Sequence, residues 1–385
     1  MKSKSSYSDK DNPPFVYGPA VSDDYYINRS NDEKRLMTNF KTCVNTILVS
    51  PRRYGKTSLV KKMCRQLTSK KLKVVYVDVY KCRDEYEFYN TFVESLLRQT
   101  STKFEEWKNL AQGFLERLQP KITLSSDPLL DYSVSLGISK KTHSPEEVLE
   151  LPEKIAEKND WKIVVCIDEF QQIGEFSDSL AFQKQLRSVW QHHKKTCYCL
   201  FGSKKHLMDE LFLKNNYPFY RFGDIIHLGK IPTDDWVNYI CNRFALFGKE
   251  ISKEFAVRIV EFVENNAAYV QQLASLTFYY TQKVAEENSL LAAMEDLLQQ
   301  NLPLYTLAAE SLTSYQMNFL RALVLGVHKE FGSADVREEF RLGSPANIGR
   351  IKEALIKQEL ILVNDYGYDF ADPVFKKWFG RYCMM

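Results

Sequence analysis

The residues between 50 and 58 combine the side chains that a polyphosphate site requires. They read Ser-Pro-Arg-Arg-Tyr-Gly-Lys-Thr-Ser, with an apolar run, Val44–Val49, before them and a helix-forming run, Leu59–Leu67, after them. Backbone N–H groups of a loop between a strand and a helix can surround an anion at the positive end of the helix dipole, while a lysine adds charge and a hydroxyl adds a magnesium ligand. The segment therefore predicts a site for a nucleoside triphosphate.

Several residues of this loop have an expected role. Lys56 is expected to reach the β and γ phosphates, Thr57 to ligate magnesium, and Gly55 to let the backbone approach the phosphates without a Cβ in the way. Ser50 stands where the usual pattern has glycine, and it would restrict the loop if that position needs a positive φ. Such a restriction would affect the affinity for nucleotide more than the identification of the segment as a phosphate loop. The alternative interpretation is a basic surface turn before an ordinary helix, with solvated arginines. The predicted nucleotide-binding residues of the loop are Ser50, Pro51, Arg52, Arg53, Tyr54, Gly55, Lys56, Thr57 and Ser58.

A second candidate motif is a pair of carboxylates at the end of an apolar strand. Asp168 and Glu169 follow the run Lys162–Ile167. Because consecutive side chains of a strand diverge, the two acids can take different roles: Asp168 would hold magnesium, through water, and Glu169 would orient and deprotonate the attacking water. The alternative interpretation is a helix-capping pair at the end of a strand.

Two weaker candidates complete the predicted catalytic set. The strand Thr196–Phe201 ends in Gly202-Ser203, and in a parallel sheet Ser203 would lie at the same carboxyl edge as Asp168, close to a γ-phosphate or water. The alternative is a plain strand-to-helix turn. Arg221 precedes the last strand, from where a guanidinium could stabilise developing phosphoryl charge, within its own chain or on a neighbour. The alternative is a structural or solvated arginine.

Five apolar runs that are continuous rather than alternating predict a parallel sheet covered by helices on both faces. Residues 121–138 alternate instead, which predicts an inserted β-hairpin. The expected strands are Val44–Val49, Leu72–Val79, Lys162–Ile167, Thr196–Phe201 and Asp224–Leu228.

The second half of the chain is expected to be mainly helical. From Thr233 to about Leu302 apolar residues recur at helical spacing, and Thr233 is expected to cap the first helix with its hydroxyl. Three helices and a hairpin around Asn364–Gly367 then predict a winged helix. The expected division is a flexible tail at 1–20, a P-loop domain at 21–232 with a hairpin insertion at 120–140, a helical domain at 233–305 and a winged helix at 306–385.

Composition excludes few functions. The 385 residues include 52 basic and 49 acidic side chains, which give a net charge of +3. The overall charge therefore does not predict binding to nucleic acid or to a membrane. The eight cysteines form no C-x-x-C pair, which argues against a cysteine metal site and favours a reduced, cytoplasmic setting. The start of the chain lacks the apolar core of a secretory signal, and no apolar run is long enough to cross a bilayer.

Taken together, these residues resemble the archaeal-type ATPase family, a branch of the STAND class of signalling ATPases within the AAA-like P-loop proteins. Beyond the two motifs, Tyr26-Ile27-Asn28-Arg29 is similar to a family motif that lies near the adenine, and Gly202-Ser203 stands where the family carries its first sensor. Asp372-Pro373, followed by Phe375 and Trp378, is similar to the closing motif of the family's winged helix. In one departure, Asn266-Ala267-Ala268-Tyr269 replaces the glycine-x-proline with which a lid helix commonly starts.

The resemblance implies that 21–232 is an ATPase domain and that 233–305 is a helical lid. It implies ATP and ADP as ligands in a cleft between the sheet and the lid, with Mg²⁺ as cofactor. It also implies contacts from Asn28 and Arg29, and from Pro232 to the base. The leading hypothesis is an ATPase that acts as a conformational switch in signalling or regulation, with a protein partner at the lid or the winged helix. Two alternatives remain open: a nucleotide-sensing DNA-binding regulator that uses the winged helix, and a scaffold that binds nucleotide without hydrolysing it. Oligomeric state and pathway are left open. The candidate DNA contacts are Asn347, Arg350, Lys352 and Lys357.

Overall fold

The computed structural model describes residues 13–19, 21, 23–27, 29–100, 121–123, 133–135 and 144–384. The chain forms two compact units. One is Arg29–Gly229, and the other consists of the segment before Arg29 together with everything from Lys230 onward. The first unit is therefore inserted, in sequence, into the second. We describe each unit by itself.

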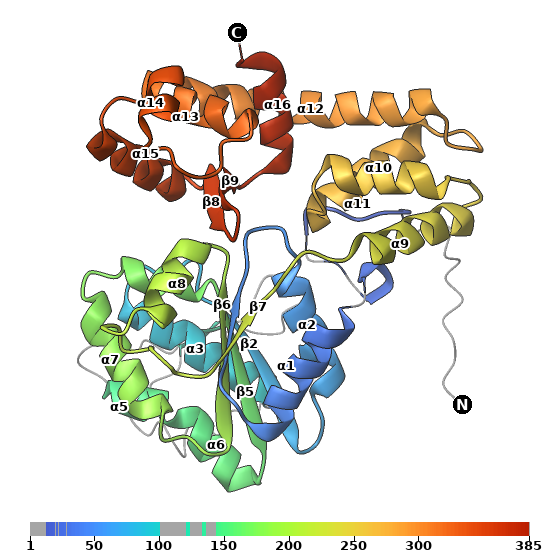
Figure 1. Cartoon of the computed structure of the whole chain (residues 1–385). Helices are drawn as coiled ribbons and strands as arrows, with labels where there is room; N and C mark the ends of the chain where they lie inside the picture. The colour runs from blue at the N-terminus through green and yellow to red at the C-terminus, as the bar shows by residue number, and fades with distance from the viewer. Residues whose placement is uncertain are drawn as a thin grey trace. The chain divides into compact units, whose positions relative to one another are not determined.

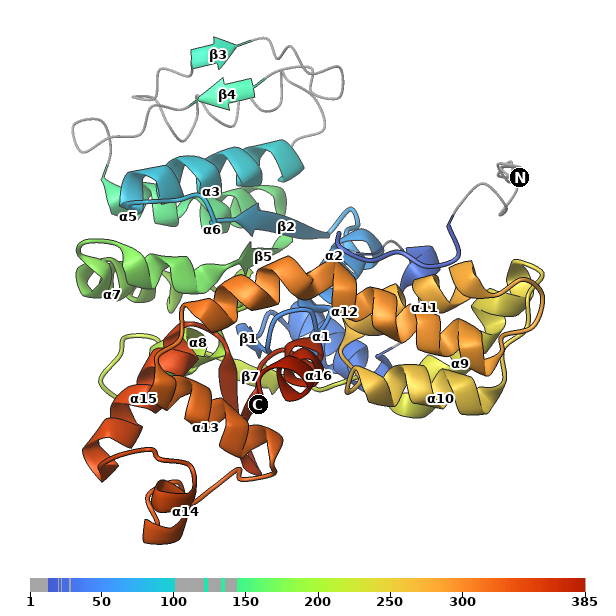
Figure 2. The ribbon, with the colours of Figure 1, turned by 90° about the horizontal axis from the view of Figure 1, so that it is seen from above.

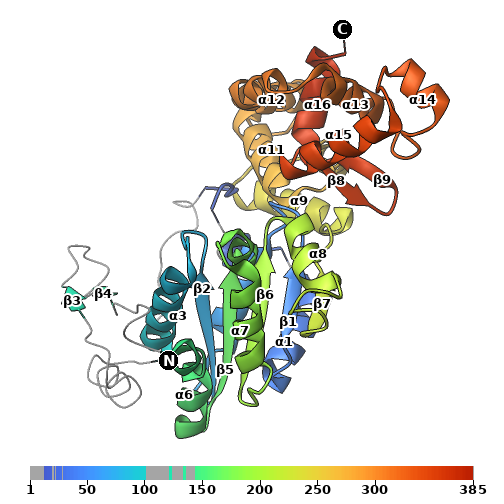
Figure 3. The ribbon, with the colours of Figure 1, turned by 90° about the vertical axis from the view of Figure 1, so that its left-hand side faces the viewer.

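The first unit is built on a parallel five-stranded sheet with the order β2-β5-β6-β1-β7 (Figure 3). This confirms the predicted sheet, although β1 begins two residues later than expected. The strands are β1 (Thr46–Val49), β2 (Leu72–Asp78), β5 (Lys162–Asp168), β6 (Thr196–Gly202) and β7 (Asp224–His227).

Helices cover both faces of this sheet, with α1 and α2 on one face and α3, α7 and α8 on the other (Figure 1). The strands are buried on both sides, so their apolar runs are continuous; in β1, for example, Ile47 and Leu48 point to opposite faces and both are fully buried. The helices are α1 (Ser30–Thr42), α2 (Lys56–Leu67), α3 (Glu85–Thr100), α5 (Pro145–Leu149), α6 (Leu151–Asn159), α7 (Ser179–Trp190) and α8 (Lys205–Leu213), with a short 3-10 helix, η3 (Phe170–Glu175).

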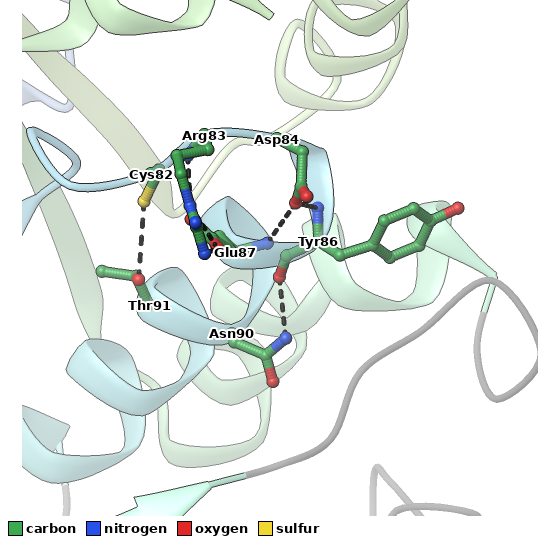
Figure 4. Close-up of polar contacts among 7 residues, drawn as sticks. All are labelled: Cys82, Arg83, Asp84, Tyr86, Glu87, Asn90 and Thr91. Atoms are coloured by element: carbon green, nitrogen blue, oxygen red, sulfur yellow. Dashed lines mark hydrogen bonds and ion pairs between the residues drawn. The ribbon is translucent and has the colours of Figure 1, made fainter.

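Side chains fix the start of α3 (Figure 4). This helix packs along edge strand β2. Asp84 Oδ1 accepts hydrogen bonds from the backbone N–H groups of Tyr86 and Glu87, both at 2.9 Å. The Glu87 carboxylate in turn accepts from Arg83 N at 2.9 Å and Arg83 Nε at 3.0 Å. Because the first N–H groups of a helix lack partners within the helix, these acceptors define where α3 begins.

The expected hairpin insertion corresponds to two short strands, β3 (Lys121–Thr123) and β4 (Ser133–Ser135) (Figure 2). They pair antiparallel with Ile122 opposite Val134, as the alternating pattern requires.

The second unit is helical apart from one hairpin, β8 (Ile361–Asn364) with β9 (Gly367–Phe370). A single apolar core connects its first helices to its last one, from Trp236 and Leu273 to Leu320 and Trp378. Its helices are α9 (Thr233–Leu246), α10 (Lys253–Phe262), α11 (Ala267–Tyr280), α12 (Glu287–Glu310), α13 (Ser314–Val324), α14 (Ala334–Glu339), α15 (Pro345–Lys357) and α16 (Pro373–Tyr382).

The order expected for a winged helix is present in this segment, as α13, α14, α15 and then the β8–β9 hairpin. The winged helix itself stays an interpretation of the segment. The expected boundary at residue 305 falls inside the continuous helix α12. Asp372 caps α16 by accepting from Val374 N and Phe375 N, and its other oxygen accepts from Tyr269 of α11 and Tyr305 of α12. One carboxylate therefore ties three helices together across the expected lid and winged helix.

Two local expectations for this unit are wrong. Thr233 does not cap α9: it is the first helical residue after Pro232, and its hydroxyl accepts a hydrogen bond from Asn265 Nδ2 at 2.9 Å. The expectation of a flexible tail at 1–20 is wrong for Phe15, one of its described residues, because Phe15 is 2% exposed and packs against Phe244 and Tyr239 of α9. No helix among the described residues is both long and apolar enough to cross a membrane.

Candidate nucleotide site

The loop between β1 and α2 needs an unusual backbone at two positions. Gly55 has φ 87°, where a residue with a Cβ is strained, and Arg53 has φ 66°. Ser50, by contrast, does not have a positive φ. The expected penalty for replacing glycine at position 50 is therefore absent, because the left-handed positions of this loop lie further along it.

The ammonium group of Lys56 lies inside the loop. Lys56 is 6% exposed, and its Nζ donates to the carbonyl oxygens of Ser50 at 3.1 Å and Pro51 at 3.2 Å. Ser58 is buried below the loop, whereas Arg52 and Arg53 are exposed. A positive charge is thus held at the N-terminus of α2, where the helix dipole also favours an anion.

Thr57 and Asp168 meet although 111 residues separate them in the sequence. Thr57 Oγ1 donates to Asp168 Oδ2 at 3.1 Å, and the Tyr76 hydroxyl donates to the same oxygen at 2.5 Å. Burial raises the pKa of Asp168, and the hydrogen bond from Tyr76 opposes that change. Burial and the nearby Asp168 charge raise the pKa of Tyr76, so its hydroxyl stays a donor. A hydroxyl beside a carboxylate is the oxygen donor set that suits Mg²⁺ in nucleotide sites.

The backbone turns sharply at Glu169, which has φ 55° and ψ 37°. Its Oε2 accepts from the Ser203 hydroxyl at 2.9 Å and from Gln171 Nε2. Gln171 is 2% exposed, and a Cβ on Gly202 would lie 1.6 Å from its Oε1. Ser203 thus lies beside the predicted base, and Gly202 leaves the space that Gln171 fills.

The parallel register explains why these residues lie at one edge of the sheet. Val49 pairs with Gly202, so Ser50 and Ser203 both leave the sheet at its carboxyl edge. Asp168 is the last residue of β5, the neighbouring strand. The strand-end prediction placed these residues correctly.

Arg221 lies at the opposite edge. It precedes β7, whose first residue, Asp224, pairs with Thr46 at the start of β1, whereas the phosphate loop follows the end of β1. Its side chain is exposed and lies over the Tyr220 ring. This position does not favour a catalytic role for Arg221 within its own chain, because a chain returning to start a parallel strand must reach the amino edge; that role stays a prediction. A role on a neighbouring chain stays a prediction.

Arg29, one of the residues that the family motif assigned to the nucleotide, contacts the phosphate loop. It is buried, and its guanidinium donates to Tyr54 O at 2.7 Å and to Gly229 O at 2.8 Å. Asn28 lies outside the described residues. Pro232 belongs to the second unit, where it flanks α9, and its contact with the base stays a prediction.

Sequence reasoning missed Tyr76, and it gave Gln171 no role. Tyr76 carries a polar group within the otherwise apolar run of β2, and it pairs with Cys166, two residues before Asp168. Gln171 follows the two carboxylates in the sequence, but only the fold shows that its amide turns back toward Glu169.

Comparisons with known proteins identify the family of the chain and its fold. The sequence profile of a family described as an ATPase domain predominantly from Archaea matches residues 28–225, about half of the chain. The fold and the matched segment define a P-loop ATPase domain. The chain belongs to this family of archaeal ATPase domains. Among curated protein sequences, none is significantly similar to the chain.

Solved structures share the fold over most of the chain. The Walker-type ATPase PABY2304 of Pyrococcus abyssi is 16% identical, with a TM-score of 0.68, and the match covers 95% of this chain and 99% of that one. The Aeropyrum pernix ORC2 protein, solved in ADPNP–ADP complexes, is 12% identical, with a TM-score of 0.56 and coverage of 94% and 96%. At these identities the likeness concerns the fold.

Proposed function

We propose that this protein binds ATP with Mg²⁺ and hydrolyses it, and that turnover resets a conformational switch. The observation that carries the proposal is the contact between Thr57 Oγ1 and Asp168 Oδ2, which joins the phosphate loop to the carboxylate motif. Membership in the ATPase family and the ORC2 neighbour solved with ADP and ADPNP support ATP as the nucleotide.

Each residue of the site has a separate role in the proposed reaction. Lys56 neutralises phosphate charge at the loop, where the dipole of α2 adds to its effect. Glu169 orients a water and accepts its proton; the two donors that hold its carboxylate both contact Oε2, which leaves Oε1 as the oxygen to accept the proton. Thr57 and, through water, Asp168 would hold magnesium, which would supply positive charge against the phosphates.

Phosphate release by the purified full chain, with Mg²⁺ and ATP, tests the proposal. The wild type is expected to release phosphate, and Glu169→Gln is expected to bind ATP with unchanged affinity while releasing phosphate at least about 100-fold more slowly, because it lacks the base. Glu175→Gln is the matched control: it makes the same change at an exposed glutamate of η3 and should leave the rate unchanged.

Two results contradict hydrolysis by this mechanism. ATP binding without any phosphate release by the wild type indicates the non-hydrolysing scaffold. Normal release by Glu169→Gln removes Glu169 from the reaction.

The side chains of α15 do not favour the DNA-binding alternative. Lys352 Nζ lies 4.5 Å from the centroid of the Tyr368 ring, and Asn347 Nδ2 donates to Leu342 O at 3.0 Å. Two of the four candidate DNA contacts therefore make structural contacts within the second unit. We propose a protein partner for this unit; affinity for duplex DNA that falls steeply with salt would contradict this.

A further inference from the structure

The Asp168 carboxylate is held by donors from three different elements. Oδ2 accepts from Thr57 of α2 and from the Tyr76 hydroxyl of β2, and Oδ1 accepts from the backbone N–H of Glu169 at 2.9 Å. Three donors on two oxygens fix both the position and the plane of a carboxylate. Of the three, Thr57 and Glu169 belong to the motifs already described, whereas Tyr76 belongs to neither.

Tyr76 is itself anchored from the outer side of the sheet. β2 is an edge strand, so some of its backbone groups have no neighbouring strand to pair with. At Tyr76 the side chain of Gln99 replaces that strand: its Oε1 accepts from Tyr76 N at 2.9 Å, and its Nε2 donates to Tyr76 O at 2.8 Å. Gln99 lies in the last turn of α3, the helix whose start is fixed by Asp84 and Glu87.

The aromatic ring of Tyr76 lies next to α2. Lys61 Nζ of that helix lies 5.0 Å from the centroid of the Tyr76 ring, within the range of a cation–π contact. The ring is thus held between strand and phosphate-loop helix, with its hydroxyl directed at Asp168. A phenylalanine could fill the same space but could not donate a hydrogen bond, so only the hydroxyl distinguishes this site from an ordinary packed aromatic residue.

We propose that Tyr76 is a positioning residue that orients the Asp168 carboxylate toward the magnesium of the nucleotide complex, with Gln99 holding Tyr76 in place. The inference rests on the proposed nucleotide function. Tyr76 acts through Asp168 and touches neither phosphate nor water. Residues that hold a metal ligand in this way are typically worth about 10-fold or more in metal affinity.

The test measures nucleotide binding rather than turnover. A fluorescent ATP analogue is titrated into the full chain in EDTA and over a series of Mg²⁺ concentrations. For Tyr76→Phe we expect unchanged affinity in EDTA and an increase of about 10-fold in the Mg²⁺ concentration that gives half of the magnesium-dependent gain in affinity. A merely structural effect would change both quantities.

Tyr80→Phe is the matched control, because Tyr80 follows the same strand, is 65% exposed and loses the same hydroxyl. Gln99→Met keeps the Tyr76 hydroxyl but removes its anchor, and it should give a smaller increase in the same direction; it also tests the proposal if Tyr76→Phe proves unstable. If Tyr76→Phe or, in its place, Gln99→Met behaves like Tyr80→Phe, the inference is wrong while the proposed function stands. If magnesium does not affect nucleotide binding by the wild type, both are wrong.

Discussion

At the scale of single residues, the backbone conformation of Glu169 separates two adjacent acids. Consecutive carboxylates at the end of a strand would repel each other if both pointed to one place, but the left-handed turn at Glu169 directs its side chain to Ser203 and Gln171 while Asp168 stays with Thr57. A left-handed conformation at a glutamate costs free energy, of order 1 kcal/mol or more. This strain is located at the residue proposed as the general base.

Gly202→Ala is predicted to disturb this base without touching the phosphate loop. The new methyl group would collide with Gln171 and displace the amide that donates to Glu169. We expect a loss of about 1–3 kcal/mol in the free energy of unfolding and slower phosphate release, with little change in ATP affinity. Urea unfolding and a phosphate-release assay measure the two effects.

Gly174→Ala serves as the control for that substitution. Gly174 lies in η3, close in sequence to Gln171, and a Cβ there would meet no atom within 4 Å. It should leave phosphate release unchanged. Equal behaviour of the two alanine variants would show that the space beside Gly202 does not matter.

At the scale of elements, one buried carboxylate fixes the start of β6. Glu153 of α6 is 7% exposed and accepts from the backbone N–H groups of Lys194 at 2.8 Å, Lys195 at 3.0 Å and Thr196 at 2.8 Å. Burial raises the pKa of Glu153, but the hydrogen bonds from Lys195, Lys194 and Thr196 and the interaction with His193 together lower it more, so the pKa lies below its usual value. The charged form is therefore the form that stabilises the fold.

The stabilisation by Glu153 should depend on pH. Because its pKa is lower in the folded chain than in the unfolded chain, its contribution is complete above the unfolded pKa of about 4.3 and is lost as the pH falls through the folded value. Glu153→Gln should cost about 1–3 kcal/mol at neutral pH and reduce the loss of stability on acidification. Urea unfolding at about pH 7 and about pH 3.5 measures both.

The exposed Glu157 on the same helix provides the control, as Glu157→Gln. It should keep the stability at neutral pH and the acid sensitivity of the wild type. An identical pH profile for both variants would mean that Glu153 does not contribute through its charge.

The strands of the first unit were predictable because their central residues are continuous apolar runs, as in Ile163–Ile167, and because the motif residues follow those strands directly. Asp168 and Ser203 could be placed together from the parallel topology alone. Contacts that depend on side-chain direction could not: the Tyr76 hydroxyl reaches Asp168 from another strand, and no spacing in the sequence records this. Arg221 was predicted near the phosphates although it precedes β7, and a segment that leads into a parallel strand ends at the amino edge of the sheet, away from the phosphate loop.

At the scale of the whole molecule, the segment before Arg29 is part of the second unit. Phe15 packs against Tyr239, Phe244 and Phe278, with ring centroids 6.0, 5.9 and 6.4 Å away. Arg243 Nε also donates to Pro14 O at 2.6 Å. The sequence predicted a flexible tail at 1–20, but among its described residues Phe15 belongs to the apolar core of the second unit.

Phe15→Ala is predicted to destabilise the second unit by about 3–5 kcal/mol, because it removes a fully packed aromatic side chain. Tyr17→Ala, at a position that is 41% exposed, should change stability by less than about 0.5 kcal/mol. Thermal unfolding of the full chain, followed by circular dichroism, compares the two. Indistinguishable melting curves would show that the segment around Phe15 adds nothing to the unit.

The inserted arrangement also fixes an order of events during synthesis on the ribosome. Phe15 emerges early, but its partners on α9 and α11 are translated only after all of residues 29–229. At typical elongation rates that interval is on the order of ten seconds or more. The first unit can thus fold while Phe15 still lacks the helices against which it packs. During this interval the exposed Phe15 side chain is accessible to a chaperone.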